Sequence, residues 1–137
     1  MKNLKDYIVS LNPYNIFIMI KPEFLKKAKA ILDIFLNDGY TIAKYGCRRL
    51  SYEEAAELYK MHKDEPYYDE LCKYTCSGLS ISYCLNYTGT EDPIKHTDAI
   101  KDNVRNTFGK DQMRNALHSS DSVENVRRES KLYFKQA

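Results

Sequence analysis

A continuous apolar run near the start of the chain constrains the fold more than any other feature. Residues 16–21 read IFIMIK, which is the length of one β-strand and has no polar side chain before Lys21. A strand without alternating polar residues is typical of one that is buried on both faces. Pro22 follows at once and cannot donate a backbone hydrogen bond, so the strand ends there. The run therefore predicts a buried strand in a sheet that helices cover.

The rest of the chain alternates between helix and strand patterns. Apolar residues from Phe24 to Phe35 recur with helical spacing, and Gly39 stands where a helix-ending glycine belongs. Ser51 and Glu54 form a capping box that opens a helix through Tyr59. The remaining elements, in order, are a strand at 41–48, a helix between Pro66 and Gly78, a strand at 80–87, a loop at 88–97, a helix ended by Gly109, a short strand around 115–118, and a last helix from Asp121 or Ser122 to about Tyr133. This order predicts an α/β sandwich, an α+β arrangement of helices packed on a small sheet.

Length and charge narrow the class of protein. The chain has 137 residues, which is enough for one domain whose core is stable without disulfides or a bound metal. The formal net charge is +2, which gives only weak support to a nucleic-acid partner. No apolar run approaches the roughly 20 residues that cross a bilayer, and the first residues do not resemble a signal peptide. We expect a cytoplasmic protein without a membrane partner, with an N-terminal extension at 1–14 and one domain at 15–137.

The cysteines offer little chemistry. Without a secretory signal, we expect Cys47, Cys72, Cys76 and Cys84 to be free thiols. Cys72 and Cys76 are one helical turn apart, so they are either two metal ligands or two small buried side chains. No CxxC pair exists and no nearby histidine completes a zinc set, which favours the second reading and predicts no metal held by the protein itself.

The segment NALHSSDS, residues 115–122, is the strongest candidate for a reactive site. It places His118 among small polar residues just before a capped helix, whose free N–H groups and dipole suit a phosphate. Imidazole titrates near neutrality and can act as a nucleophile, and Glu129 on the same helix could hold it. On these residues alone, an ordinary loop histidine beside an N-cap is the favoured interpretation. Likewise, Lys21 either faces a phosphate at the strand end or simply leaves the core there.

Several spaced motifs together resemble the nucleoside diphosphate kinase family. NALHSSDS resembles the family signature N-x-x-H-G-S-D-S, and IFIMIKP resembles its first strand with Lys-Pro. LYKMHKDEPYYDELCKYTCSG is similar to its H-Y-x-x-L-x-x-x-P-F-F-x-x-L-x-x-Y-x-x-S-G segment, and IKDNVRNTFGKDQMRNALH to its I-R-x-x-F-G-x-x-x-x-x-N-x-x-H segment. The resemblance covers about residues 15–134, nearly the whole chain, and the motifs occur in the family's order.

The resemblance implies a fold and a reaction. The fold would be a ferredoxin-like, four-stranded antiparallel sheet covered by helices. His118 would take the γ-phosphate of a nucleoside triphosphate and pass it to a nucleoside diphosphate, with Glu129 and Ser120 supporting the imidazole. The nucleotide itself would contact Lys21, Tyr59, Arg105 and Asn115, with Tyr67 and Leu71 beside the base. Tyr67 keeps an aromatic face for stacking, and stacking tolerates any base. Mg²⁺ would be carried by the nucleotide phosphates, and the family's dimers, which assemble further, imply at least a homodimer here.

The chain also departs from the family pattern. The family's helix and phosphate-binding Arg between the third strand and the following loop are missing, which indicates a divergent branch. Glu91 aligns with a threonine that contacts a phosphate in the family, and its carboxylate would repel a phosphate there. Ser119 replaces the family's glycine after the active histidine. Lys95, His96 or Lys101 would be the available substitutes for the lost cation. We therefore expect weak nucleotide binding, because a lost charge-assisted contact costs roughly 1.5–3 kcal/mol.

Two functional readings stay open beside the active kinase. The missing helix is consistent with a nucleotide-binding or scaffold module that has weak or no turnover. A nucleic-acid-binding regulator has only the weak net charge in its favour. The retained set of His118, Glu129, Lys21, Arg105 and Asn115 favours the kinase, since a degenerate site would be expected to lose its nucleophile first.

Overall fold

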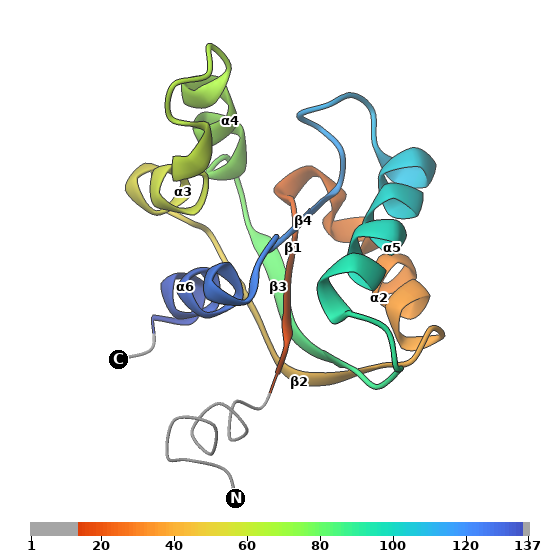
Figure 1. Ribbon diagram of the computed structural model, residues 1–137. Helices are drawn as coiled ribbons and strands as arrows, with labels where there is room; N and C mark the ends of the chain where they lie inside the picture. The colour runs from red at the N-terminus through yellow and green to blue at the C-terminus, as the bar shows by residue number, and fades with distance from the viewer. Residues whose placement is uncertain (1–13, 136–137) are drawn as a thin grey trace, which may run out of the picture.

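The protein forms one four-stranded antiparallel sheet with helices on both sides. The computed structural model describes residues 14–135, and its strand order is β2-β3-β1-β4 (Figure 1). The elements are β1 Ile16–Ile20, the 3₁₀-helix η1 Pro22–Lys27, α2 Ala28–Leu36, β2 Tyr40–Arg48, α3 Tyr52–Leu58, the 3₁₀-helix η2 Lys60–His62, α4 Tyr68–Thr75, β3 Ser80–Tyr87, α5 Pro93–Phe108, β4 Leu117–Ser119 and α6 Val123–Phe134. This is the ferredoxin-like arrangement that the family resemblance implied, and it confirms the predicted fold class.

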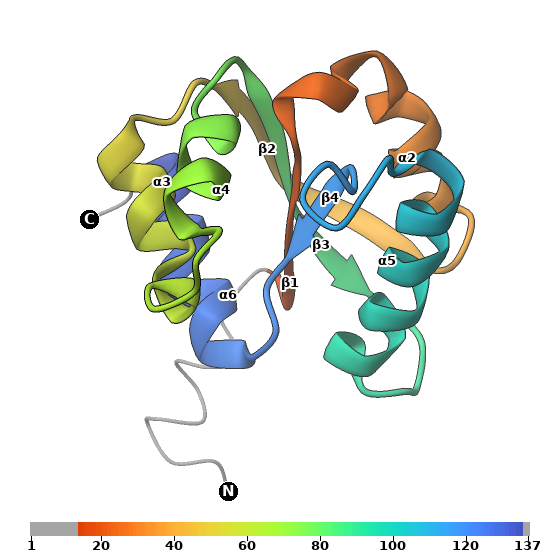
Figure 2. The ribbon, with the colours of Figure 1, turned by 90° about the horizontal axis from the view of Figure 1, so that it is seen from above.

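Strand β1 is buried on both faces, as its sequence predicts. Its even-numbered side chains pack under α2 and α5, with Ile31 and Val104 among the residues of that core. Its odd-numbered side chains, Phe17 and Met19, pack in a second core with Tyr133 of α6. Figure 2 shows the two layers, with α2 and α5 on one side of the sheet and α3, α4 and α6 on the other. Each β1 side chain therefore contributes to one of two separate cores.

Four local features agree with the sequence predictions. The Ser51 side chain accepts from the Glu54 backbone N–H while the Glu54 carboxylate accepts from the Ser51 N–H, so the capping box is complete. Gly39 lies where the chain turns from α2 into β2. Its φ of +89° is in the left-handed region, which residues other than glycine rarely adopt. Strand β3 has the predicted bounds. Ser122 is the residue that caps the last helix, since its Oγ accepts from the Asn125 N–H.

The structure corrects three of the predicted boundaries. The stretch 88–97 is not all loop, because α5 already begins at Pro93 with Asp92 as its N-cap, accepting from the Ile94 N–H. The predicted helix at Pro66 begins two residues later, at Tyr68. The first helical stripe is two elements, since Phe24 has non-helical backbone angles and separates a 3₁₀ turn from α2.

Three remaining expectations concern the chain ends, the cysteines and the membrane. Most of the expected extension 1–14 lies outside the described residues, while Tyr14 itself is buried, with its hydroxyl 3.0 Å from Ser130 Oγ. All four cysteines are free thiols, as predicted, and Cys72 is buried. Within residues 14–135, no helix is both long and apolar enough to cross a bilayer.

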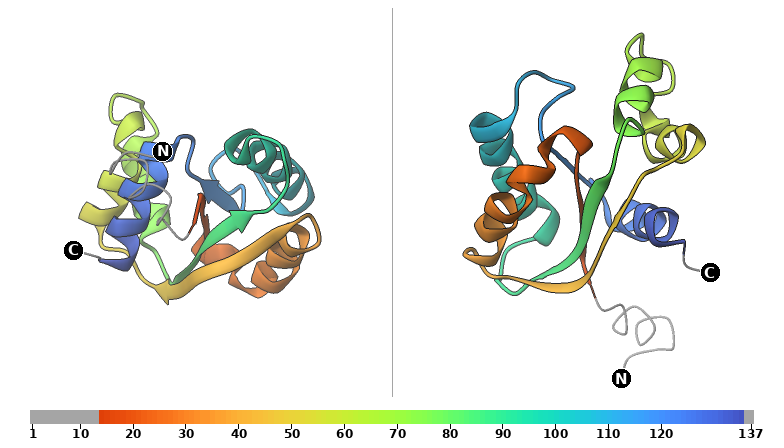
Figure 3. Two further views of the ribbon diagram at one scale, coloured as in Figure 1. Left: turned by 60° about the horizontal axis from the view of Figure 1, so that its bottom comes forward. Right: turned by 180° about the vertical axis from the view of Figure 1, so that it is seen from behind.

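The sheet has two different edges. Strand β2 forms one edge and the short β4 the other (Figure 3). Because β4 pairs only with the end of β1, His118 lies opposite Met19, close to the end of β1 at Ile20 and to Lys21, which follows it. The fold thus brings together two segments that are about a hundred residues apart in the sequence.

Candidate active site

An open cavity of about 1150 Å³ lies where β1 and β4 end. Its walls come from η2 and α4 on one side, from α5 on the other, and from the connection between α5 and β4. Of the nine site residues named from the sequence, eight line it: Lys21, Tyr59, Tyr67, Leu71, Arg105, Asn115, His118 and Glu129. The ninth, Ser120, does not line the cavity but donates a hydrogen bond to Glu129. The fold therefore gathers the whole candidate set at one place.

The His118 imidazole is held at one nitrogen and open at the other. Its Nε2 lies 2.5 Å from Glu129 Oε1, and Ser120 Oγ donates to the same oxygen at 2.9 Å. A carboxylate oxygen accepts, so Nε2 carries the proton and Nδ1 carries the lone pair. Within residues 14–135, no hydrogen bond is made to Nδ1, and the ring borders the cavity. The geometry presents Nδ1 as a nucleophile.

The backbone just before this histidine is strained. Ala116 is fully buried and has φ +79°, in the left-handed region that costs a residue with a side chain roughly 1–3 kcal/mol. The Lys21 N–H donates to the Ala116 carbonyl at 3.0 Å, which ties the strained residue to the end of β1. This bend directs Leu117 into the α2/α5 core and the next side chain, His118, to the opposite face.

Lys21 is a buried cation at the bottom of the cavity. Its side chain donates to the Met113 carbonyl at 3.0 Å and lies 5.8 Å from the centre of the Tyr59 ring. Burial, and then the nearby Arg105 guanidinium, lower the pKa of Lys21 to about 7. An ammonium in this position is poorly solvated, so a bound anion would be its natural partner.

Arg105 and two unpaired polar atoms complete this wall. The Arg105 guanidinium donates twice to the Leu117 carbonyl, at 3.2 and 2.9 Å, and burial lowers its pKa. Asn115 Oδ1 and Ser119 Oγ are buried and have no hydrogen-bond partner among the described residues. Both residues line the cavity. Buried polar atoms are nearly always hydrogen-bonded in folded proteins, so these two indicate a polar ligand.

The opposite wall is aromatic. Tyr67 is the residue before α4, is 40% exposed, and its hydroxyl lies 2.8 Å from His62 Nδ1. Leu71, one turn later, is buried beside it, and the Tyr59 ring meets the His118 ring edge-on at 5.2 Å. One side of the cavity can therefore stack on a flat ring while the other carries positive charge.

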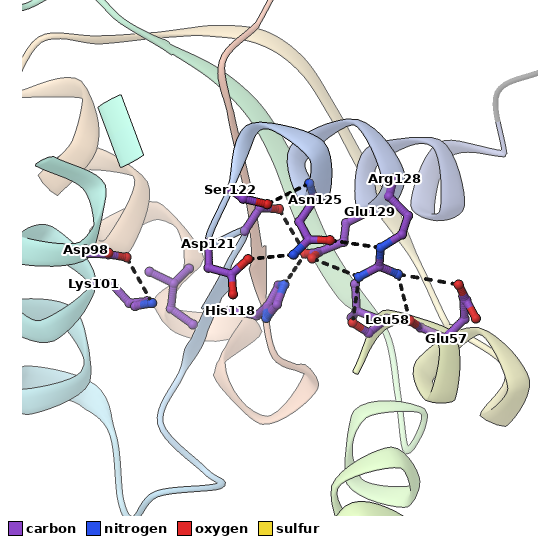
Figure 4. Close-up of polar contacts among 12 residues, drawn as sticks. Glu57, Leu58, Asp98, Lys101, His118, Asp121, Ser122, Asn125, Arg128 and Glu129 are labelled. Atoms are coloured by element: carbon purple, nitrogen blue, oxygen red, sulfur yellow. Dashed lines mark hydrogen bonds and ion pairs between the residues drawn. The ribbon is translucent and has the colours of Figure 1, made fainter. Parts of the chain in front are cut away.

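Of the three cations considered as substitutes, Lys101 alone lines the cavity. Its amino group is 3.3 Å from Asp98 Oδ1, and its side chain is 16% exposed on the α5 face shown in Figure 4. His96 is one of the corrections: it lies at the other end of the sheet, stacked on Tyr87. Glu91 accompanies it there, 3.8 Å away, and does not line the cavity, so the expected repulsion of a phosphate is wrong.

Sequence reasoning missed Arg128. Its guanidinium contacts the second oxygen of Glu129 at 3.3 Å and donates to the Glu57 carbonyl at 2.8 Å (Figure 4). A basic residue on a polar helix face carries no signal of such contacts. They depend on α6 lying against the end of α3, which the pattern of α6 alone does not reveal.

Comparison with known proteins agrees with this geometry. The family model described as nucleoside diphosphate kinase matches residues 15–137. A rat protein, nucleoside diphosphate kinase homolog 7, is 32% identical over 85% of this chain, which spans only 32% of that protein. The nucleoside diphosphate kinase of Aquifex aeolicus (strain VF5) is 31% identical, covering 82% of this chain and 87% of that enzyme. A crystal structure of the Aquifex aeolicus enzyme, 30% identical, matches 87% of this chain and 93% of its own with a TM-score of 0.76.

Proposed function

The chain belongs to the nucleoside diphosphate kinase family, and on that premise we propose that it transfers the γ-phosphate of a nucleoside triphosphate to a nucleoside diphosphate through a phosphohistidine at His118. One observation carries the proposal. The imidazole is fixed through Nε2 by a buried carboxylate, while Nδ1 borders a cavity that is also lined by the buried Lys21 and the half-buried Arg105. A fixed nucleophile facing positive charge is what phosphoryl transfer requires.

The proposed reaction has two halves. In the first, the Nδ1 lone pair attacks the γ-phosphorus, an N–P bond forms, and the bond from that phosphorus to the bridging oxygen breaks, releasing a nucleoside diphosphate. In the second, a terminal oxygen of another diphosphate attacks the same phosphorus and the N–P bond breaks. Glu129 keeps the Nε2 proton in place throughout, and Ser120 holds Glu129. The imidazole is therefore regenerated in its starting state.

Three cations are proposed to bind the phosphates. Lys21 and Arg105 lie at the bottom of the cavity beside His118, and Lys101 stands one helical turn before Arg105 on α5. The nucleotide enters as its magnesium complex, so the metal arrives with the substrate. Asn115 offers an unpaired oxygen to a hydroxyl or bound water of the nucleotide. A charged ligand of this kind explains both the buried positive charge and the unpaired acceptor.

The aromatic wall is proposed to hold the base. Tyr67 and Leu71 offer a flat, mostly apolar surface across the cavity from the cations. Stacking on an aromatic ring is worth about 1–3 kcal/mol per base and depends little on which base is bound. The enzyme is therefore expected to accept several nucleotides.

A second function stays in consideration because the connection from β3 to α5 is short. Only residues 88–92 link the two elements, and no arginine lies between Arg49 and Arg105. A cavity with fewer phosphate contacts could bind nucleotides without turning them over. Incubation with γ-labelled ATP separates the two functions. The kinase gives acid-labile label on the protein that an added diphosphate removes; binding without label would leave only the second function.

We also expect at least a homodimer. Strand β2 is a long edge strand whose outer side has no partner strand within the described residues, and Ile42 and Tyr45 on it are 41% and 73% exposed. Open edges of this kind invite pairing with another chain. Light scattering of the purified protein, with Tyr45→Lys as the variant, tests this; a monomeric wild type would contradict it.

A further inference from the structure

Arg128 joins the candidate active site to the helix behind it. Its Nη1 donates to the Glu57 carbonyl at 2.8 Å and its Nη2 lies 3.4 Å from the Leu58 carbonyl, both at the end of α3. Its Nε donates to Asn125 Oδ1 at 3.1 Å, one turn earlier on α6 (Figure 4). These contacts hold the planar guanidinium in one orientation. Two carboxylates also contact it: Glu57 Oε1 lies 3.6 Å from Nη1, and Glu129 Oε2 lies 3.3 Å from Nη2.

The Glu129 carboxylate has its two oxygens divided between two tasks. Oε1 accepts from His118 and from Ser120, whereas Oε2 faces Arg128 Nη2 at 3.3 Å. The carboxylate side chain is only 1% exposed, so water does not solvate it. A buried charge is costly unless paired and hydrogen-bonded. Among the described residues, Arg128 supplies the one permanently charged partner in contact with this carboxylate.

We infer that Arg128 is a positioning residue that fixes Glu129 and limits how tightly the His118–Glu129 pair holds an extra proton. This inference rests on the proposed function, in which unprotonated His118 is the nucleophile. A positive charge beside Oε2 opposes the arrival of a second positive charge on the pair. His118 therefore stays unprotonated, with its Nδ1 lone pair available, to lower pH than it would beside an unpaired glutamate.

The other charges around the pair come from every neighbouring element. The titratable residues across the cavity or behind Arg128 are Lys21, Glu57, Tyr59, His62, Tyr67, Glu70, Lys73, Tyr74, Lys101, Arg105, Asp111, Arg114 and Asp121. All of them are the same in the wild type and in an Arg128 variant. A difference between the two proteins therefore isolates the charge at position 128.

The test follows the imidazole rather than turnover. The His118 ring signals are followed by heteronuclear NMR between about pH 5 and pH 9 in the nucleotide-free protein and assigned with His118→Gln. Arg128→Gln keeps an amide donor for the α3 carbonyls but removes the charge. Its His118 midpoint is expected to move to higher pH by roughly one pH unit, because the removed charge has the same sign as the added proton and contacts the carboxylate that holds the imidazole. The acid limb of phosphoenzyme formation moves with it.

Three further variants make the result decisive. Arg128→Lys keeps the charge and is expected to restore the midpoint, even if its looser contacts slow the reaction at every pH. Arg127→Met removes the same charge from an exposed position on α6 and is expected to leave the midpoint in place. Arg128→Met repeats the charge loss without the amide.

The outcomes separate this inference from the proposed function. An unmoved midpoint in folded Arg128→Gln, or an equal shift in Arg127→Met, would overturn the inference. A protein that never forms a phosphoenzyme would overturn the proposed function, while the NMR titration would still report on Arg128. A lower rate with an unchanged pH profile would show that Arg128 acts only by joining α6 to α3, and would also overturn it.

Discussion

The molecule has two histidine clusters at opposite ends of the sheet, and both contain tyrosines and carboxylates. His96 lies near the start of β2, stacked on Tyr87 with ring centres 4.1 Å apart. Its Nδ1 is 2.9 Å from the Tyr40 hydroxyl and its Nε2 is 3.2 Å from Asp38 Oδ2. His118, by contrast, is bonded at Nε2 only, to a carboxylate that is 1% exposed.

The difference lies in the second nitrogen and in the surroundings of the carboxylate. Both nitrogens of His96 have partners within the protein, and its carboxylates, Asp38 and Glu91, are 56% and 68% exposed. His118 keeps Nδ1 for a ligand, shares its cavity with the buried Lys21 and the half-buried Arg105, and pairs with a carboxylate that water does not screen. A nearby carboxylate is therefore not enough to make a histidine a nucleophile; an open nitrogen on a charged cavity is also required.

The largest expected effect tests the comparison directly. His118→Ala is expected to remove the phosphoenzyme and to lower transfer between ATP and another diphosphate by at least roughly a thousandfold, because the covalent carrier is gone. His96→Ala and His62→Ala are expected to keep the label. Acid-labile incorporation from γ-labelled ATP measures all three, and double-reciprocal plots for the wild type should be parallel. Near-normal transfer in His118→Ala would rule out this carrier.

Replacing the carboxylate of each cluster, Glu129 or Asp38, should change the rate of phosphoenzyme formation to very different extents. Glu129→Gln keeps an oxygen for the Nε2 proton but removes the buried charge, so phosphoenzyme formation should slow by roughly 10²–10⁴-fold, as for other buried carboxylates that hold a catalytic histidine. Asp38→Asn, at the His96 cluster, is expected to leave the rate unchanged. Rapid-quench measurement of both variants decides, and equal effects would mean that the two clusters are not distinct.

These clusters also mark how far sequence reasoning reached. The motif at 115–122 predicted a segment that lines the cavity, and the apolar run at 16–21 predicted the buried strand beside it, because both signals are local. The Asp92–Pro93 pair is a helix start, and the turn residues around it predict a loop instead; only a loop over 88–97 would bring His96 to the cavity. No local signal could place His96 against Tyr87 or Arg128 against the end of α3, since those contacts depend on packing between distant segments.

Lys21 gives the active-site end a pH dependence. Its folded pKa of about 7 lies below the ordinary lysine pKa of 10.5, so the unfolded chain binds more protons between these two values and stability rises with pH across them. Nucleotide affinity, by contrast, should fall as the pH rises. Above pH 7 the free enzyme must regain a proton to pair with a phosphate, and affinity falls by up to about tenfold per pH unit.

Calorimetry of ADP binding checks this dependence. Lys21→Met is expected to bind ADP roughly ten- to a hundredfold more weakly, from the loss of one charge-assisted hydrogen bond, and with a flatter pH profile. Repeating the titration in buffers of different ionisation enthalpy measures the proton taken up, which should disappear in the variant. A wild type whose ADP affinity is flat above pH 7 would contradict the role given to Lys21.

A smaller effect is expected from the cation on α5. Lys101→Met should weaken ADP binding by about tenfold, since the lost contact is charged but only partly buried. Asp98→Asn frees Lys101 from its partner at 3.3 Å and should tighten binding slightly. Lys95→Met is the matched control, because Lys95 is an exposed lysine of the same helix that does not line the cavity. Equal Kd values for the Lys95 and Lys101 variants would remove Lys101 from the phosphate site.

The smallest expected effect concerns the His96 cluster, which should affect stability and not transfer. His96→Phe keeps a flat ring against Tyr87 but removes the hydrogen bond to the Tyr40 hydroxyl, a group whose pKa burial raises to about 12. That hydroxyl keeps Thr97 Oγ1 as a partner at 2.7 Å, so it is not left unpaired. His96→Phe also removes the contact with Asp38, which is 56% exposed, so that this loss adds little. Urea unfolding should therefore show a loss of only about 0.5–1.5 kcal/mol, the usual net value of one hydrogen bond.

In a double-mutant cycle with Tyr40→Phe the two losses should not add, because both variants remove the same bond. Phosphoenzyme formation should be unchanged in every member of the cycle; a variant that lost its label while staying folded would show that this end of the sheet communicates with His118, and the separation of the two clusters would be wrong.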